Sequence, residues 1–141
     1  MSEFQLPVKV GDRATFSRMV TGEDIDAFAR VSGDNQPLHL NDSFASKTRF
    51  KKRIAHGMIS AAYISAALGT KLAPDAVVVY LGQTMRFRLP VGIGDTITAE
   101  CEVTAIDAER RIATVRTDCT NQNGDAVVTG EATVLLDPLP A

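Results

Sequence analysis

Two segments in the first half of the chain show helical hydrophobic spacing. Apolar side chains recur at intervals of three and four within Gly22–Val31, which predicts a short amphipathic helix with Thr21 as its N-cap. The segment Ile54–Lys71 carries no charge before its last residue and is rich in glycine, alanine and serine. A helix that is apolar on all sides is expected to be buried on nearly all sides. Gly69 is its predicted C-cap.

From Ala76 onward the hydrophobic period changes to two, which predicts β-strands. The predicted strands are Ala76–Leu89, Thr96–Ile106, Arg111–Thr120 and Ala126–Leu136, and Arg13–Val20 could add another. Short turns between them favour antiparallel pairing, and the long helix is the natural partner for their apolar face. We therefore expect one α+β domain over residues 1–141, with a curved antiparallel sheet around a central helix. The open edges of such a small sheet favour dimerisation.

Composition and charge narrow the class of protein. A chain of 141 residues with 45% hydrophobic and 23% charged residues is typical of a single soluble domain with a core. A net charge of −2 gives no reason to expect a nucleic-acid partner. Cys101 and Cys119 fall in predicted strands and are interpreted as buried free thiols. Without a secretory signal or a run of about 20 apolar residues, we expect a cytoplasmic protein with no membrane segment.

The stretch Ser32–His39 contains two side chains that can move protons. Pro37 lacks a backbone N–H and restricts Gln36 to an extended conformation, so this stretch is predicted to be non-helical, with neither side chain buried in regular structure. Asp34 and His39 would then act together on one water molecule as a general acid/base pair. The alternative is a structural role, because Asp in a turn often bonds to backbone amides.

A dense run of positive charge, Lys47–Arg53, precedes the second helix. Such runs are usually solvated loops, and the sequence alone favours that interpretation. The alternative is a docking surface for a phosphorylated ligand, because Arg and Lys pair with phosphate oxygens.

Four ordered motifs make the sequence resemble the MaoC-like branch of the hot-dog proteins, specifically the (R)-specific enoyl-CoA hydratases. They are Phe28–Asp34 running into Pro37–His39, Arg53–Met58, Tyr80–Gln83 followed by Phe87 and Pro90, and Val91–Thr96. The resemblance covers most of the chain, from about the first strand to Leu136. One position departs from the family pattern, since Gln36 stands where an Asn is usual.

The resemblance implies a hot-dog fold and reversible hydration of a trans-2-enoyl thioester to an (R)-3-hydroxyacyl thioester. It implies that Asp34 and His39 are the catalytic pair and that the backbone amide of Gly57 stabilises the enolate-like oxygen, although Gly57 could simply start the helix. Ser65 is assigned an orienting role, and His56 is left as structural. No metal or redox cofactor is implied.

An acyl-CoA substrate would also change the interpretation of the basic run. Coenzyme A carries three phosphates, and the candidate contacts for them are Arg49, Lys51, Lys52 and Arg53. Besides the acyl-CoA substrate, the expected partner is a second copy of the chain, in a homodimer or a higher homo-oligomer. Acyl chain length, and the choice between CoA and an acyl carrier protein, are left open.

Two other functions fit much of the same pattern. A hot-dog acyl-CoA thioesterase would share the fold and the CoA site but would hydrolyse the thioester. A non-catalytic acyl-CoA or acyl-carrier binding module would bind without turnover. The presence of both Asp34 and His39 favours the hydratase over the thioesterase.

Overall fold

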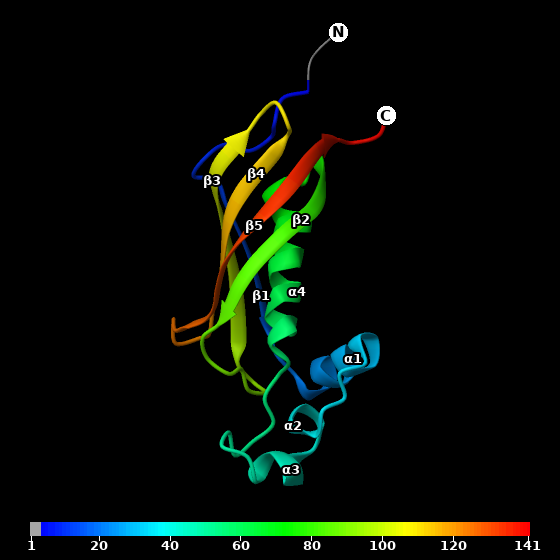
Figure 1. The fold of residues 1–141 in the computed structure, drawn as a ribbon, viewed down its shortest axis with the longest axis vertical. Coiled ribbons are helices and arrows are strands. Elements are labelled where there is room, and N and C mark those ends of the chain that lie inside the picture. Colours follow the sequence, from blue (N-terminus) through cyan, green and yellow to red (C-terminus); the bar gives the residue numbers. More distant parts are fainter. Residues whose placement is uncertain (1–3) are drawn as a thin grey trace.

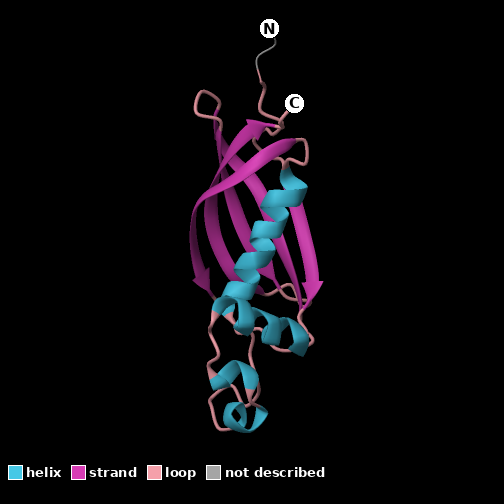
Figure 2. Cartoon of the chain, turned by 90° about the vertical axis from the view of Figure 1, so that its right-hand side faces the viewer, coloured by secondary structure: helices cyan, strands magenta, loops and turns pink. Residues whose placement is uncertain are grey.

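The computed structural model describes residues 4–141, which form a five-stranded antiparallel sheet curved around a long helix (Figures 1 and 2). The strand order is β1-β3-β4-β5-β2. The strands are β1 (Arg13–Met19), β2 (Ala76–Phe87), β3 (Thr96–Asp107), β4 (Ile112–Thr120) and β5 (Ala126–Pro138). The helices are α1 (Gly22–Ser32), α2 (Pro37–Leu40), α3 (Asp42–Ser46) and α4 (Gly57–Ala67), which continues as the π-helical η1 (Leu68–Leu72). This is the hot-dog arrangement that the resemblance implies.

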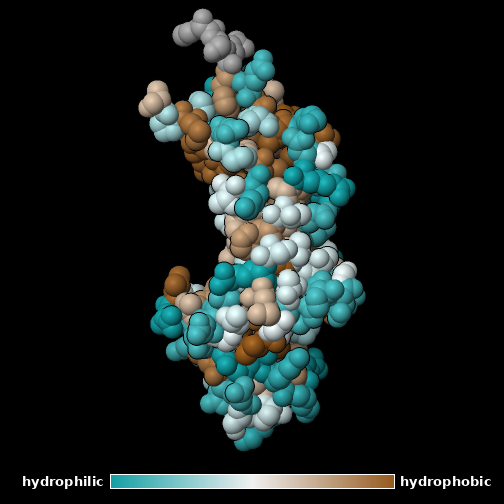
Figure 3. Space-filling model, turned by 180° about the vertical axis from the view of Figure 1, so that it is seen from behind, coloured by the Kyte–Doolittle hydropathy of each residue, from teal (hydrophilic) through white to brown (hydrophobic). Residues whose placement is uncertain are grey.

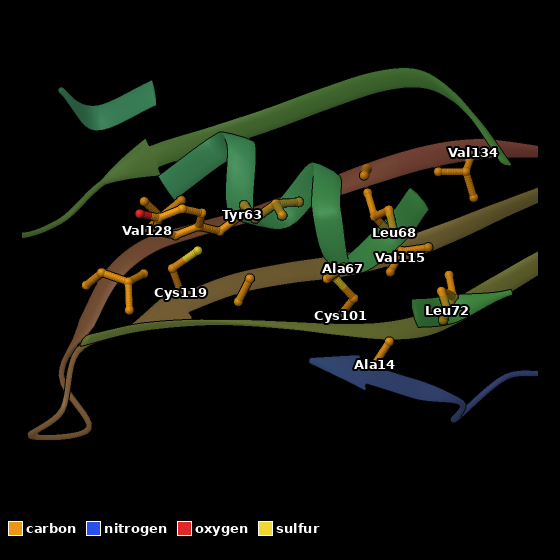
Figure 4. Close-up of a cluster of buried hydrophobic side chains, with 14 of the residues drawn as sticks. Ala14, Tyr63, Ala67, Leu68, Leu72, Cys101, Val115, Cys119, Val128 and Val134 are labelled. Atoms are coloured by element: carbon orange, nitrogen blue, oxygen red, sulfur yellow. The ribbon is translucent and has the colours of Figure 1, made fainter. Parts of the chain in front are cut away.

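The core lies between α4 and the inner face of the sheet (Figure 4). Ala67 and Leu68 of the helical segment point towards buried side chains of β3, β4 and β5. Cys101 and Cys119 are both buried free thiols, which confirms the sequence-based interpretation. Burial raises the pKa of each thiol to about 12.

Helix α1 follows the sequence prediction closely. The Thr21 hydroxyl accepts the Asp24 N–H at 3.1 Å, and the Asp24 carboxylate accepts the Thr21 N–H at 3.3 Å, which forms a capping box. The helix ends one residue later than predicted, and Gly33 then takes the left-handed conformation with φ 81°. The connector that carries Asp34 therefore begins directly after this C-cap glycine.

The second helix differs from its prediction in three ways. It begins at Gly57 because Ile54 is used in an isolated bridge to Gly92. Gly69 does not end it, because the chain continues as a π-helix and buries Leu72. One side of α4 is exposed, with Met58 52% exposed, so burial on nearly all sides was wrong. Hydropathy alone cannot distinguish an apolar face in the core from one that faces outward.

The two ends of the molecule are built from different elements. The C-terminus and the N-terminal end of the described chain lie at one end of the sheet, whereas α1, α2 and α3 lie at the other end, beyond the start of α4 (Figure 1). The space-filling view from behind is hollowed at mid-height between these two ends (Figure 3). Among residues 4–141, no helix is long and apolar enough to cross a membrane. The cytoplasmic location stays a prediction, as does the extent of the single domain, of which residues 1–3 lie outside the described part.

Candidate active site

Asp34 and His39 meet beside the start of α4. One side-chain ligand atom from each, together with one from His56, lie within 4.8 Å of one another. Gln36 is extended as predicted, with φ −56° and ψ 131°. However, Pro37 begins the short helix α2, since the first helical turn tolerates proline, and this helix carries His39. The prediction of a non-helical stretch was therefore wrong after Gln36.

The His39 imidazole is buried and its tautomer is set by the backbone. Its Nδ1 lies 2.8 Å from the Ile54 carbonyl oxygen, and because a carbonyl can only accept, Nδ1 carries the proton. The lone pair of Nε2 is therefore available to take a proton from water. His39 is only 8% exposed, which corrects the expectation that this side chain is not buried.

Asp34 lies in an exposed connector and is held mainly through its backbone. Its N–H donates to the Ser32 hydroxyl at 3.1 Å, and its carbonyl oxygen accepts the Nε2–H of His56 at 2.8 Å. Its carboxylate accepts the Gln36 N–H at 3.3 Å, an Asx-turn contact that leaves the other carboxylate oxygen available. Asp34 and His39 can therefore share one water molecule.

His56 is the residue that sequence reasoning left as structural. Its ring stacks on His39 with centroids 3.9 Å apart and 26° between the planes, and Phe28 meets it edge-on at 4.9 Å. It is 4% exposed. The only signal in the sequence was its place directly before Gly57, and nothing in the spacing showed that it would contact both Asp34 and His39.

Gly57 is the first residue of α4 and lines an apolar cavity of about 440 Å³. The N–H groups of a first helical turn have no intrahelical partner and lie at the positive end of the helix dipole. A Cβ at Gly57 would lie 2.7 Å from Cε1 of Phe87, so the ring packs directly against the glycine. Members of the cavity lining are His39, Phe50, Gly57, Met58, Phe87 and Val128. A carbonyl group in this cavity can reach both the helix N-terminus and His39.

A second cavity of about 440 Å³ lies between α4 and β2 and shares Met58 with the first. Tyr80 and Gln83 line it, and the Tyr80 hydroxyl donates to the Gln83 side-chain oxygen. Burial raises the pKa of Tyr80 to about 12, so its hydroxyl keeps its proton at neutral pH. The Gln83 amide in turn donates to the hydroxyl of buried Thr117 at 2.8 Å.

Comparison with known proteins identifies the family. A model of the MaoC-like domain matches residues 3–124. The chain belongs to this family. It is 45% identical over 129 residues to an (R)-specific enoyl-CoA hydratase of Rhodospirillum rubrum, covering 92% of this chain and 88% of that protein. It is 44% identical over 129 residues to the (R)-specific enoyl-CoA hydratase of Aeromonas caviae, covering 92% and 96%.

A solved structure extends the match to three dimensions. The unliganded R-hydratase PhaJ1 from Pseudomonas aeruginosa superposes with a TM-score of 0.87 at 40% identity, covering 96% of this chain and 88% of that one. The hot-dog fold and the MaoC-like resemblance inferred from the sequence are thus confirmed.

In this MaoC-like chain, Ser65 is separated from the other predicted catalytic residues. Ser65 lies about two helical turns beyond Gly57 on the exposed side of α4 and does not line the cavity beside His39. Within one chain it is not brought together with Asp34 and His39.

The basic residues divide into two groups. Arg49, Lys51 and Lys52 are exposed in the loop before α4, and Phe50 between them lines the cavity of this MaoC-like protein. Arg53 is used internally instead: its Nε donates to the His39 carbonyl oxygen at 2.7 Å, and its guanidinium pairs with Asp26 at 3.3 Å. The Arg53 side chain is only 14% exposed, and its bond to the His39 carbonyl oxygen stabilises α2.

By spacing alone, Asp34, His39 and His56 could hold a metal ion. A carboxylate and two imidazoles are ligand types that suit Zn²⁺ or a similar divalent ion. One ring nitrogen of each histidine already bonds to a backbone carbonyl, so each ring could supply only its other nitrogen. General acid/base chemistry needs only water and side chains of these types.

Proposed function

We propose that this protein is an (R)-specific enoyl-CoA hydratase. It adds water reversibly to a trans-2-enoyl-CoA to give an (R)-3-hydroxyacyl-CoA, which makes it a hydro-lyase. The observation that carries the proposal is the grouping of Asp34 and His39 within 4.8 Å, at the start of the helix whose first residue, Gly57, lines an apolar cavity. The two relatives named as (R)-specific enoyl-CoA hydratases, at 45% and 44% identity, support it.

The reaction uses each part of this arrangement. One water molecule lies between the Asp34 carboxylate and Nε2 of His39, and its oxygen attacks C3 of the enoyl group while the pair takes a proton. The electron pair of the double bond moves towards the thioester carbonyl, and the resulting enolate oxygen accepts the Gly57 N–H. The pair then returns a proton to C2. The two residues act as one coupled unit, so protonation steps belong to the pair.

The first experiment follows crotonyl-CoA with the purified protein. We expect the ultraviolet absorbance of the enoyl thioester to fall without release of free thiol, and chiral analysis to give the (R)-3-hydroxy product. Asp34→Asn and His39→Ala should each lower kcat by about 10²–10⁴-fold, the usual contribution of general acid/base catalysis. The matched control is Asp125→Asn, which removes an exposed carboxylate in the β4–β5 turn and should leave kcat unchanged.

The same assay separates the two alternatives. Free thiol without hydration would identify a thioesterase. Binding of crotonyl-CoA without turnover, unaffected by Asp34→Asn, would identify a non-catalytic binding module. Either outcome contradicts the hydratase proposal.

The phosphates of CoA are assigned to Arg49, Lys51 and Lys52 only. These side chains are exposed beside Phe50 at the cavity, whereas Arg53 is held by His39 and Asp26. Charge reversal at Lys51 and Lys52 should raise KM for crotonyl-CoA by about tenfold or more, because charge-assisted phosphate contacts are among the stronger polar interactions. The KM for crotonyl-pantetheine, which lacks those phosphates, should not change.

The control for this test is Lys71→Glu, an exposed charge reversal in η1, beyond the other end of α4. It should leave both KM values unchanged. Equal effects of the Lys51 and Lys52 variants on the two substrates would contradict the assignment.

The protein is proposed to be a homodimer formed through α4 and the edge strand β2. Exposed apolar side chains lie on this side, with Met58 52% and Leu81 51% exposed, and within residues 4–141 β2 pairs with β5 alone. Apolar surface of this kind beside an open strand edge favours a second copy. Ser65 lies on the exposed side of α4, so an orienting role would be exerted on the pair of the partner subunit.

A further inference from the structure

We propose that His56 is a positioning residue that holds Asp34 and His39 in register with each other and with Gly57. The inference rests on the proposed function and adds a residue to the same site. His56 touches neither the attacking water nor the substrate in this scheme. It acts through contacts to the two members of the acid/base pair.

The first contact fixes Asp34. The connector that carries Asp34 is exposed, and within residues 4–141 the Asp34 side chain makes a single hydrogen bond, the 3.3 Å contact with the Gln36 amide. The 2.8 Å bond from His56 Nε2–H to the Asp34 carbonyl oxygen ties this connector to the buried start of α4. Without that bond the carboxylate would be positioned by the connector alone.

The second contact fixes the plane of His39. One face of the His39 ring is covered by His56 at 3.9 Å, while its Nδ1–H is held by the Ile54 carbonyl at 2.8 Å. A ring that is bonded at one nitrogen can still rotate about that bond, and a stacked neighbour prevents this. The two constraints together direct Nε2 of His39.

All of these contacts come from one short segment. Ile54 and His56 lie within the three residues before Gly57, and this segment is bonded to the rest of the fold through the Ala55 N–H, which donates to the Val91 carbonyl at 2.7 Å. The segment that orients Asp34 and His39 is therefore continuous in sequence with Gly57, the residue that offers the backbone amide. Small displacements of reacting groups, of about 1 Å, can cost about 100-fold in rate, so such continuity matters for catalysis.

A purely structural role explains His56 less well. Because Nε2 donates its proton to Asp34, Nδ1 is left as an acceptor, and within residues 4–141 this buried atom has no hydrogen-bond partner. Buried polar atoms are nearly always paired, and an unpaired one costs stability. A residue that served only the packing of this region would not need that nitrogen.

The decisive experiment compares two amide substitutions that differ only in reach. The side-chain nitrogen of Gln matches the position of histidine Nε2, whereas that of Asn matches Nδ1 and cannot reach the Asp34 carbonyl. With crotonyl-CoA, His56→Gln should keep kcat within about fivefold of the unmodified protein, and His56→Asn should lose about 10- to 100-fold. For both variants we expect KM to change by less than about threefold, because substrate contacts are intact.

His56→Phe isolates the hydrogen bond to Asp34, since it keeps a ring against His39 but removes the donor. It should lose kcat as His56→Asn does. In the Asp34→Asn background, His56→Asn should cause little further loss, because residues that act through one another are not additive. Thermal unfolding of His56→Gln and His56→Asn should have similar midpoints, which separates catalysis from folding.

The inference is overturned if the wild-type protein is active and the His56→Gln and His56→Asn variants have equal kcat values. It is also overturned if the loss of kcat follows the loss of thermal stability across the variants. Failure of the proposed function would instead be seen in the unmodified protein, as no hydration of crotonyl-CoA.

Discussion

At the scale of single residues, Gly57 is constrained from two directions. It lines the cavity at the start of α4, and the Phe87 ring occupies the place where a side chain would begin. The two constraints predict different responses to substitution. Packing against Phe87 is a matter of volume, whereas access of a substrate carbonyl to the backbone amide is a matter of catalysis.

The variant Gly57→Ala separates these constraints. Its Cβ would meet Cε1 of Phe87 at 2.7 Å and would also crowd the approach to the amide, so we expect kcat to fall by about tenfold or more. The double variant Gly57→Ala/Phe87→Ala removes the collision. Measured against Phe87→Ala alone, it should show the same loss of kcat.

Full recovery of kcat in that double variant would mean that Gly57 is needed only to accommodate the ring. It would then be constrained by packing alone, and a Cβ at position 57 would not hinder the approach of the substrate carbonyl to the backbone amide.

The residues of the site were only partly predictable. Asp34, His39 and Gly57 could be named because turn chemistry and the motif around them are local in sequence. His56 could not be assigned its contacts, because Asp34 lies 22 positions away and the two meet only after the connector folds back onto α4. Arg53 was grouped with the exposed lysines because charge along a sequence carries no information about burial.

At the scale of elements, the N-cap of α1 is expected to contribute to the stability of the fold. The helix is held at its start by the reciprocal Thr21 and Asp24 bonds, and its Phe28 side chain reaches the His56 ring. We expect Thr21→Ala to lower the free energy of unfolding by about 1 kcal/mol, the usual cost of losing an N-cap. Urea denaturation at neutral pH measures this loss.

Thr21→Ser is the matched control, because serine keeps the capping hydroxyl and should restore most of the stability. Well below the unfolding midpoint, kcat should be unaffected in both variants. A Thr21→Ser protein as unstable as Thr21→Ala would show that the threonine methyl group, and not the cap, stabilises this end of α1.

The elements that sequence predicted well were those with local signals. The capping residues of α1 and the alternating strands are encoded in neighbouring positions, and their bounds agree closely with the structure. The start and end of α4 were less predictable, since a bridge to Gly92 and the burial of Leu72 decide them. Helix α2 was missed because four residues give too short a pattern to recognise.

At the scale of the whole molecule, the side formed by α4 and β2 should decide the oligomeric state. Leu81 is 51% exposed on the edge strand β2, and a charge there would be buried in the proposed dimer. We expect Leu81→Glu to convert the dimer to a monomer, as measured by size-exclusion chromatography with light scattering. The control is Val10→Glu, an exposed apolar position just before β1, the strand at the opposite edge of the sheet from β2.

A monomeric wild-type protein at micromolar concentration, or a Leu81→Glu protein that remains dimeric, would contradict the dimer proposed through β2. Loss of kcat in a monomeric but folded Leu81→Glu protein would agree with a contribution of Ser65 across the interface.

The two thiols between α4 and the sheet have a practical consequence. Cys101 and Cys119 are shielded from solvent, and a pKa of about 12 leaves almost no thiolate at neutral pH. The two native cysteines should therefore react very slowly with alkylating reagents. A cysteine introduced on the surface would be labelled long before they are. The slow rate at which Cys101 and Cys119 are labelled in the native protein would then measure how often the sheet opens transiently from α4.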